Sequence, residues 1–474
     1  MKLRYEELPA LISCRLHPAS LKGELGASGI DSRLLKSGDL FWALRGEHSD
    51  GHDFVGSALE NGAQAAVVRE AWLAQNSSRF PQAAFVIVAD PLKALQDLAR
   101  RHRRRFAIPV VALTGSNGKT STKEMIAAAL SRRFRVVKSQ DNFNNHIGIP
   151  LTLLQLHDAT QLVVLEMGAN HPGEISFLCS IAQPTAGLVL NVGPAHLEGF
   201  GSVENIAREK GAIYETLPED GVAFFNLDDP WVAKMLSPAK TQVGYSFAEA
   251  AESRFAKLIT ARKLDLTEDG YSGLRIGKTT IRLSLPGLAP LSNALAAVAV
   301  ADHFGVPMPS IAEALSTLAP VKGRMDVQRA GGILVIDDTY NANSASTQAA
   351  LDFLTSLQVK GRRIAVLGDH LELGAQSESE HRKIGKMLLA PAISGAILIG
   401  GQMRHAWAEF SGCGKMAVYY DYPDDYDDIV DILLKILRPG DAILIKGSRG
   451  MRLEKISEGL LRGLEPAPLT TEVA

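Results

Sequence analysis

At 474 residues the chain is too long for one ordinary hydrophobic core, so we expect two to four domains. Its apolar fraction of 46% and charged fraction of 22% are typical of a globular protein. A formal net charge of −2 provides no general attraction to nucleic acid or to anionic membranes, which argues against both as partners.

The sequence favours a cytoplasmic protein. Its first seven residues include charged side chains where a signal peptide needs an apolar core. It has no uninterrupted apolar run of about 18 residues, the length that a membrane helix requires, so no membrane insertion is expected. Cys14, Cys179 and Cys413 are odd in number and widely separated, which favours a reducing compartment over a disulfide framework.

The N-terminal part, residues 1–90, is predicted to be a small α/β domain. Residues 38–44 and 65–68 are apolar runs typical of strands, and residues 54–61 have the composition of a helix.

A longer helix is predicted to begin at Pro91, with Asp90 as its N-cap, and to run to about Phe106. Its last turns carry a basic run at residues 100–105. Cations suit the negative end of a helix dipole, and the sequence has no second basic cluster. We therefore interpret the run as a solvated helix end rather than a nucleic-acid patch.

Residues 91–319 are predicted to form a central domain around a parallel sheet. Short, nearly continuous apolar runs, which are typical of strands buried on both faces, occur at residues 135–138, 162–165 and 187–190.

Residues 320–474 repeat this pattern and predict a third domain with a Rossmann-like, doubly wound sheet. Its expected strands are residues 333–336, 363–367, 396–399 and 442–445. The acidic stretch 419–428 is interpreted as a loop and the acid-rich first turn of a helix rather than as a cation site.

The strongest local motif is a glycine-rich turn between an apolar run at 110–113 and a helical segment. Glycine permits close backbone approach, and inward N–H groups together with a helix N-terminus favour a bound phosphate. The predicted nucleotide-binding residues are Thr114, Gly115, Ser116, Asn117, Gly118, Lys119, Thr120 and Ser121. Lys119 would reach the terminal phosphates, and the Thr120 hydroxyl would ligate Mg²⁺. The alternative is a glycine turn with a surface lysine.

Two further residues follow predicted strands and could meet a metal bound beside the nucleotide. Glu166 ends the run 162–165, and His196 follows the next strand along the chain. Carboxyl ends of parallel strands share one edge of a sheet, so both side chains are candidate ligands for Mg²⁺ or Mn²⁺. The alternatives are an acid in a surface loop and a hydrogen-bonded loop histidine.

The motifs taken together resemble the Mur ligases of peptidoglycan synthesis. The resemblance spans nearly the whole chain and is carried by residues 31–33, 38–44, 50–54, 114–120, 142–150, 166–170, 191–196, 337–343, 367–374 and 446–449. It implies a UDP-sugar-binding N-terminal domain, an ATP-binding central domain and a Rossmann-like C-terminal domain.

The resemblance also implies roles that the residues alone do not reveal. Lys210 matches a lysine that the family carbamylates with CO₂, which would add an anionic metal ligand. Arg324 matches an arginine brought to the γ-phosphate, and Asp338 an acid that contacts the ATP ribose. Asn293 matches an asparagine on the adenine side. The expected catalytic set is therefore Lys119, Lys210, His196 and Arg324, and the expected metal set is Thr120, Glu166, His196 and Lys210.

Substrate contacts are implied for Ser32, Arg33, Asn142 and Asn145. One departure concerns adenine: the family's Gly-x-His-Asn-x-x-Asn has Ala289 and Pro290 here in place of the His and first Asn.

The implied activity is ATP-dependent ligation of D-alanyl-D-alanine to UDP-N-acetylmuramoyl-tripeptide through an acyl phosphate. These small molecules would be the partners, and we expect a monomer. Three alternatives stay open: a sister ligase acting on another amino acid or on a folate, a P-loop ATPase that transduces energy or binds nucleic acid, and a non-catalytic binding module.

Overall fold

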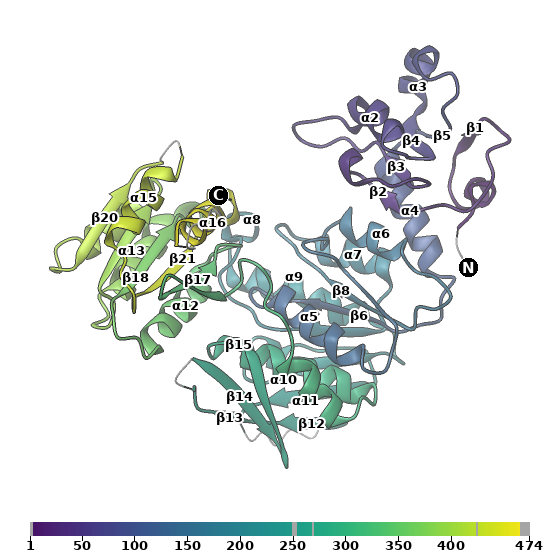
Figure 1. The fold of residues 1–474 in the computed structure, drawn as a ribbon. Coiled ribbons are helices and arrows are strands. Elements are labelled where there is room, and N and C mark those ends of the chain that lie inside the picture. The colour runs from purple at the N-terminus through teal and green to yellow at the C-terminus, as the bar shows by residue number, and fades with distance from the viewer. Residues whose placement is uncertain (1–2, 249–253, 268–269, 423–424, 465–474) are drawn as a thin grey trace, which may run out of the picture.

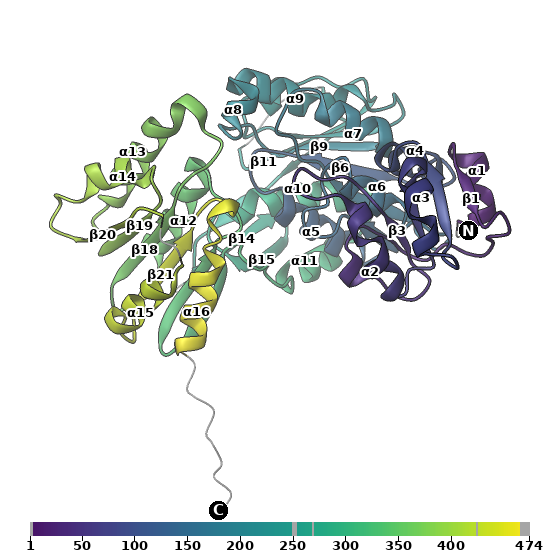
Figure 2. The same cartoon turned by 90° about the horizontal axis from the view of Figure 1, so that it is seen from above.

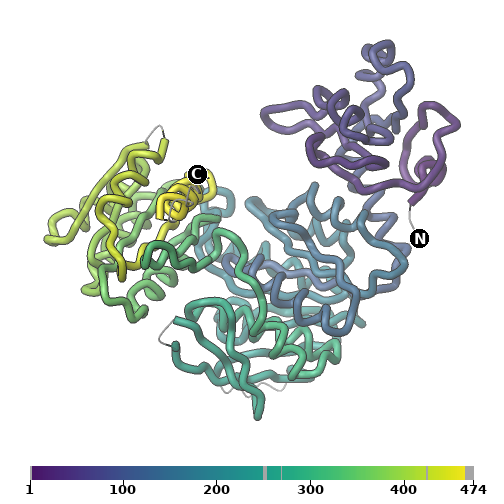
Figure 3. Tube along the Cα trace, in the orientation of Figure 1, coloured from purple at the N-terminus to yellow at the C-terminus, as the bar shows by residue number. Residues whose placement is uncertain are grey.

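The computed structural model of the chain describes residues 3–248, 254–267, 270–422 and 425–464. Three α/β units follow one another, and the first and third lie at opposite ends of the middle one (Figure 1, Figure 3). This arrangement confirms the predicted fold class; the domain boundaries at 90 and 319 stay predictions. Parts of three predicted segments, residues 1–2, 423–424 and 465–474, lie outside the described residues. None of the described helices combines the length and apolarity needed to cross a membrane.

The N-terminal unit is built on a five-stranded sheet in the order β1-β5-β4-β3-β2, in which β1 pairs antiparallel with β5 and the other pairs are parallel. Its strands are β1 (Arg15–His17), β2 (Ser28–Gly29), β3 (Leu40–Trp42), β4 (Ala65–Arg69) and β5 (Phe85–Val88). Its helices are α1 (Leu8–Leu11), α2 (Val55–Glu60) and α3 (Glu70–Asn76). The predicted strands and helix correspond to β3, β4 and α2, while β1, β2 and β5 are additional.

Helix α4 (Pro91–Arg103) begins as predicted, because the Asp90 carboxylate accepts hydrogen bonds from the first-turn N–H groups. The prediction of a solvated basic end is wrong for His102 and Arg103, which are buried. The Arg103 guanidinium donates to backbone carbonyls around the start of the central unit, those of Phe106, Ala182, Gln183 and Ile108. The planar guanidinium group of Arg103 thus links α4 to the central unit.

The central unit holds a seven-stranded, all-parallel sheet in the order β12-β11-β10-β9-β6-β8-β7. Helices cover both faces, which explains why its central strands β6, β8 and β9 are continuous, fully buried and mainly apolar (Figure 2). The strands are β6 (Val110–Thr114), β7 (Val136–Lys138), β8 (Leu162–Glu166), β9 (Ala186–Val189), β10 (Val222–Asn226), β11 (Thr241–Ser246) and β12 (Lys257–Thr260).

Two helix layers pack on this sheet. One contains α5 (Lys119–Leu130), α10 (Ala289–His303) and α11 (Met308–Ser316). The other contains α6 (Gly148–Leu153), α7 (Glu174–Ala182) and α9 (Val203–Glu215), and the short α8 (Leu197–Phe200) precedes α9. The chain then adds an antiparallel three-stranded sheet that the sequence analysis did not predict, β13 (Arg262–Leu264), β14 (Tyr271–Ile276) and β15 (Thr279–Pro286).

The C-terminal unit has a six-stranded sheet in the order β16-β17-β21-β18-β19-β20, in which only the β16–β17 pair is antiparallel. Its strands are β16 (Asp326–Ala330), β17 (Ile333–Asp338), β18 (Arg363–Gly368), β19 (Gly395–Ile399), β20 (Met416–Tyr420) and β21 (Ala442–Lys446). Its two faces are covered by α12 (Ser344–Ser356), α13 (Ser377–Leu388) and α14 (Met403–Phe410), and by α15 (Asp427–Ile436) and α16 (Glu454–Leu464). The acidic segment does supply the first turn of α15, as predicted.

Candidate active site

The phosphate loop has the predicted strand–turn–helix form. Buried β6 ends at Thr114, and α5 begins at Lys119. Gly118 has a φ of 79°, a left-handed conformation that glycine adopts without strain. A Cβ atom at this position would lie 2.5 Å from the side-chain oxygen of Asn293, so glycine also provides the space in which α10 approaches the loop.

Neighbouring residues after β9 fix the loop in place. The Ser116 hydroxyl donates to the Gly193 carbonyl and accepts from the Gly193 N–H, both at 2.9 Å. The Asn117 N–H donates to the Asn191 side-chain oxygen at 2.9 Å. The Lys119 ammonium folds back onto the Gly115 carbonyl at 2.8 Å, and burial lowers the pKa of Lys119. The amine is thus held at the loop before any anion arrives.

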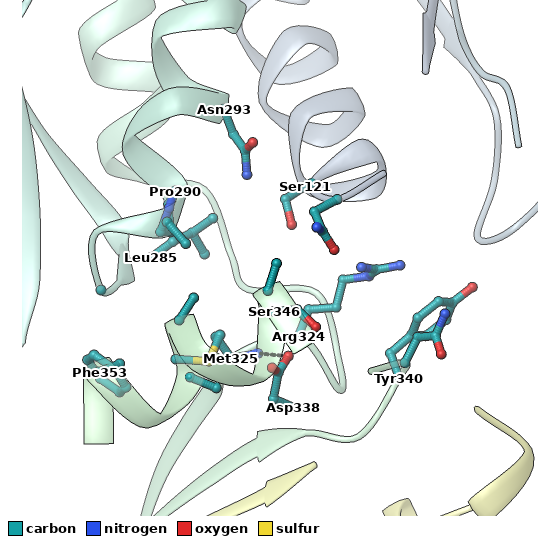
Figure 4. Close-up of a pocket in the computed structure, with 18 of the residues that line it drawn as sticks. Ser121, Leu285, Pro290, Asn293, Arg324, Met325, Asp338, Tyr340, Ser346 and Phe353 are labelled. Carbon is teal, nitrogen blue, oxygen red and sulfur yellow. Dashed lines mark hydrogen bonds between the residues drawn. The ribbon is translucent and has the colours of Figure 1, made fainter. Parts of the chain in front are cut away.

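The C-terminal unit reaches across to this loop. Arg324 donates to the Thr120 hydroxyl at 3.0 Å, and Asn343 donates from its side chain to that of Asn117 at 2.7 Å. Arg324 also lies over the Tyr340 ring, 4.1 Å from its centre. In Figure 4 the arginine extends from the C-terminal unit to the start of the helix that carries Ser121, with Tyr340 beside it.

A cavity of about 330 Å³, here called the phosphate-loop cavity, lies between the two units. One end is polar and is formed by residues 116–119. The other is largely apolar and includes Leu285, Pro290 and Phe353 (Figure 4). Asn293 and Asp338 also line this cavity. A cavity with an anion-binding end and an apolar end suits a nucleotide.

A second cavity of about 730 Å³, here called the Glu166 cavity, opens on the other side of Lys119. It is lined from the central unit by Asn142, Asn144, Asn145, Glu166 and His196, among others. Four residues line both cavities: Lys119, Arg324, Tyr340 and Asn341. A group bound in one cavity would therefore meet a group bound in the other cavity next to Lys119 and Arg324.

Glu166 has the features of an incomplete cation site. Its side chain is buried at the end of β8; one carboxylate oxygen accepts from Asn144 at 2.9 Å, and the other has no hydrogen-bond partner among the described residues. An unpaired buried carboxylate oxygen is costly unless a cation or water meets it. Across the described ranges, no three His, Cys, Asp or Glu side chains form a ready-made metal cluster. Mg²⁺ does not need one, because it keeps several waters and shares substrate phosphates.

Lys210 is a buried lysine on α9. Burial, and to a smaller extent the positive charge of Lys119, lower its pKa to about 7, although Glu209 opposes the change. Glu209 itself is held by the N–H groups of Gly173 and Ile175, each at 2.6 Å, at the start of α7. An amine in this setting is substantially neutral at pH 7, unlike an ordinary lysine.

His196 lies between the central and C-terminal units. It has a φ of 52°, and its ring nitrogen Nδ1 is hydrogen-bonded to the Glu372 carboxylate of the C-terminal unit. Because a carboxylate holds this nitrogen, the other one, Nε2, is left to face a ligand.

The predicted residues converge only in part. Lys119, Glu166, His196, Arg324, Asn142 and Asn145 line the Glu166 cavity, and residues 116–119, Ser121, Asn293 and Asp338 line the phosphate-loop cavity. Thr114, Gly115, Thr120 and Lys210 line neither cavity. Ser32 and Arg33 line neither cavity: Ser32 is buried in the N-terminal unit, and Arg33 pairs with Asp31. The assigned roles of all these residues stay predictions.

Several site residues were absent from the predicted set. Lys446 ends β21 beside Asp338 of β17; its ammonium lies 2.6 Å from that carboxylate and donates to the Asn341 carbonyl at 2.9 Å. Asn144 and Tyr340 contact Glu166 and Arg324, respectively. A usable signal existed for Lys446, since it follows an apolar strand in the same way as Glu166.

Comparison with known proteins decides the family. Three family models match in chain order, namely "Mur ligase family, catalytic domain" at residues 26–103, "Mur ligase middle domain" at 113–301 and "Mur ligase, glutamate ligase domain" at 323–449. A protein of Escherichia coli strain K12, UDP-N-acetylmuramoyl-tripeptide–D-alanyl-D-alanine ligase, is 38% identical over 453 residues, 93% of this chain and 96% of that protein. The chain belongs to the Mur ligase family.

Other relatives of this Mur ligase agree. The Bacillus subtilis strain 168 protein of the same name is 33% identical and covers 91% of this chain and 92% of its own. A crystal structure of MurF from Acinetobacter baumannii superposes with a TM-score of 0.82 at 31% identity, covering 97% and 99% of the two chains. The MurF ligase of Thermotoga maritima in complex with ADP gives 0.75 at 29% identity, covering 92% and 97%.

Proposed function

We propose that this Mur ligase joins D-alanyl-D-alanine to UDP-N-acetylmuramoyl-tripeptide, converting ATP to ADP and phosphate. One observation carries the proposal: the phosphate-loop cavity and the Glu166 cavity meet at Lys119 and Arg324. This is the geometry needed to bring a carboxylate to the terminal phosphate of ATP. The names of the relatives and the ADP bound to the Thermotoga maritima structure support the same assignment.

A peptide carboxylate is a poor electrophile, so the reaction needs an activation step. A carboxylate oxygen of the tripeptide attacks the γ-phosphorus, the bond to the β-phosphate oxygen breaks, and ADP leaves with that electron pair. The amine of D-alanyl-D-alanine then attacks the carbonyl carbon of the acyl phosphate. Phosphate leaves from the tetrahedral intermediate, and the new amide nitrogen loses a proton.

Lys119 and Arg324 stabilise the charge that develops during transfer. A carboxylate that approaches a triphosphate is repelled, and fixed cations at the meeting point offset this repulsion. Loop N–H groups and the N-terminus of α5 hold the phosphates. Arg324 comes from the C-terminal unit and contacts Thr120 of the loop, so the central and C-terminal units together form the site.

The remaining nucleotide contacts follow from the phosphate-loop cavity. Asp338, which Lys446 holds in place, would bind the ribose, and Asn293 would contact the adenine side. Ala289 and Pro290 replace the family's polar pair, so apolar side chains take over adenine contact. Leu285, Pro290 and Phe353 provide that surface.

Mg²⁺, with Mn²⁺ as a substitute, fits the residues around Glu166. The unpartnered carboxylate oxygen of Glu166 and the His196 ring, which line the same cavity, would hold it. The family resemblance adds the Thr120 hydroxyl and an anionic Lys210, neither of which lines that cavity. A bound divalent cation supplies neutralisation of phosphate charge. His196 can serve this role because Glu372 fixes its ring.

Lys210 becomes an anion by reaction with CO₂. Its neutral amine attacks the carbon of CO₂, and the nitrogen loses one proton, which leaves a carbamate. The lowered pKa supports this step, because only the neutral amine is a nucleophile. The carbamate would also remove the repulsion that an ammonium exerts on Lys119 and on a nearby cation.

The acceptor substrate would span the central and N-terminal units. Asn142 and Asn145, which line the Glu166 cavity, and Ser32 and Arg33 of the N-terminal unit would contact it. We place the enzyme in the cytoplasm as a monomer, with small-molecule partners and neither nucleic acid nor membrane.

The deciding experiment measures ADP formation with ATP and Mg²⁺, with each of the other substrates omitted in turn. We expect full-rate ADP and phosphate release only when both UDP-N-acetylmuramoyl-tripeptide and D-alanyl-D-alanine are present, with stoichiometric amide product. Equal ADP release from ATP alone would exclude the ligase and leave an ATPase. Product formed with a single amino acid but not with the dipeptide would assign a sister ligase.

A further inference from the structure

Arg449 is a cationic residue that lines the Glu166 cavity and has no role in the proposed mechanism. It follows β21 at the start of a short 3₁₀ turn, and its side chain is 62% exposed. It lines this cavity from the C-terminal unit together with Tyr340 and Asn341. The ATP-side cavity is lined by Tyr340 and Asn341 but not by Arg449. Arg449 therefore faces the peptide side of the site.

Three other cationic side chains that line the Glu166 cavity, those of Lys119, Arg324 and His196, already have hydrogen-bond partners. Lys119 donates to the phosphate loop, Arg324 donates to Thr120, and His196 is paired with Glu372. Arg449 is paired with Glu454 at 3.2 Å on the surface. Because an exposed ion pair of this kind contributes little free energy, a substrate anion can compete for the guanidinium.

The Tyr340 ring relates the two arginines. The guanidinium carbon of Arg324 lies 4.1 Å from the ring centre, and that of Arg449 lies 5.6 Å from it. One aromatic side chain thus packs against both arginines, of which Arg324 lines both cavities and Arg449 lines the Glu166 cavity. Planar guanidinium groups pack on aromatic rings while their N–H donors stay available to a carboxylate.

The incoming dipeptide carries its carboxylate at a fixed distance from its amine. A dipeptide that presents its amine near Arg324 ends in a carboxylate about 7 Å away when extended. Leaving that carboxylate without a partner in a cavity would be costly, so a cation is needed there. A single amino acid would bring its carboxylate only half as far.

We propose that Arg449 binds the C-terminal carboxylate of the dipeptide and so selects a dipeptide over a single amino acid. This inference rests on the proposed ligase function. Arg449 is a substrate-binding and specificity-determining residue and takes no part in phosphoryl transfer. Losing one charge-assisted, bidentate contact lowers the apparent affinity by roughly 10- to 100-fold.

The test changes both the protein and the substrate. Wild type and Arg449→Gln, each as the full chain, are assayed with D-alanyl-D-alanine and with D-alanyl-D-alaninamide, which lacks the carboxylate. We expect kcat/KM for the free dipeptide to fall about 30-fold in Arg449→Gln, with KM for ATP and for the UDP-tripeptide unchanged. The amide should be a poor substrate for wild type by a similar factor, and Arg449→Gln should not lower its kcat/KM further.

Two controls separate binding from folding. Arg452→Gln changes a neighbouring exposed arginine that lines neither the Glu166 nor the phosphate-loop cavity, and it should behave as wild type. Arg449→Lys keeps the positive charge but loses the planar guanidinium group that can donate two hydrogen bonds to one carboxylate. It should therefore retain part of the dipeptide selectivity. Thermal melting of each variant should match that of wild type.

Equal losses on the free dipeptide and on the amide in Arg449→Gln would overturn the inference while leaving the ligase function standing. A raised KM for ATP or for the UDP-tripeptide would overturn it too, since Arg449 would then bind a phosphate. If wild type forms no amide product with D-alanyl-D-alanine, the proposed function itself fails.

Discussion

Lys210 gives the sharpest prediction, because its environment sets a measurable chemical state. A lysine with an ordinary pKa of 10.5 is neutral in about one molecule in 3,000 at pH 7, whereas a pKa of about 7 makes about half of the molecules neutral. Burial and the charge of Lys119 thus increase the reactive amine roughly a thousandfold. The neutral share falls to roughly a tenth at pH 6 and rises to about nine-tenths at pH 8.

We therefore expect the ligase rate at limiting CO₂ to rise with pH through about 7, and to rise when bicarbonate is added. The sign follows from the reaction, since CO₂ combines with the deprotonated amine and protonation at low pH removes it. Enzyme equilibrated with ¹³C-bicarbonate should give a carbamate carbon resonance in the NMR spectrum of wild type that Lys210→Ala lacks.

Lys210→Ala should lower kcat by about 10³-fold, the size of effect seen when a group that stabilises transition-state charge is removed. Short carboxylic acids should restore part of the rate by occupying the space that the side chain leaves. Lys234→Ala, which removes an exposed lysine, is the matched control and should keep full activity. Normal turnover by Lys210→Ala, or identical ¹³C spectra for the two proteins, would refute the reasoning.

Three further predictions concern the loop, the interface and the C-terminal unit. Gly118→Ala forces a left-handed alanine and a contact with Asn293, so calorimetry should show ATP binding weakened roughly tenfold or more. Arg103→Ala leaves buried carbonyl groups without hydrogen-bond donors, so denaturant unfolding should show that the free energy of unfolding falls by about 3 kcal/mol. Burial would raise the pKa of Asp441, but hydrogen bonds from Arg362 outweigh this effect and lower the pKa. Asp441→Asn should therefore lower the free energy of unfolding by about 1–3 kcal/mol at pH 7. That difference should shrink as the pH falls below about 4, because the Asp441 carboxylate of the unfolded chain then takes up a proton more readily than that of the folded protein, whose pKa is lower.

Each of these has a clear contrary result. Unchanged ATP affinity in Gly118→Ala would mean that α10 yields to the added methyl group. A wild-type melting curve for Arg103→Ala would mean that water replaces the guanidinium at the carbonyls. A stability difference for Asp441→Asn that persists at pH 3 would assign the loss to packing rather than to ionisation.

The sequence was sufficient for features that depend on neighbours in the chain. The phosphate loop follows from an apolar strand, two glycines and a helix start within about a dozen residues, and the structure has that form. Buried parallel strands such as β8 and β21 were predictable, because a strand covered on both faces is apolar throughout. The cap of α4 at Asp90 is equally local.

Tertiary structure decided what lies far apart in sequence. Arg324 reaches Thr120 from 204 residues away, and Asn343 reaches Asn117 from 226, because the central and C-terminal units meet across one cavity. Arg103 looked like a solvated cation, yet it is buried, since its donors find carbonyls that belong to other elements. No local pattern encodes such meetings: spacing along a chain fixes backbone conformation over a few residues, whereas the packing of whole domains fixes which side chains share a site.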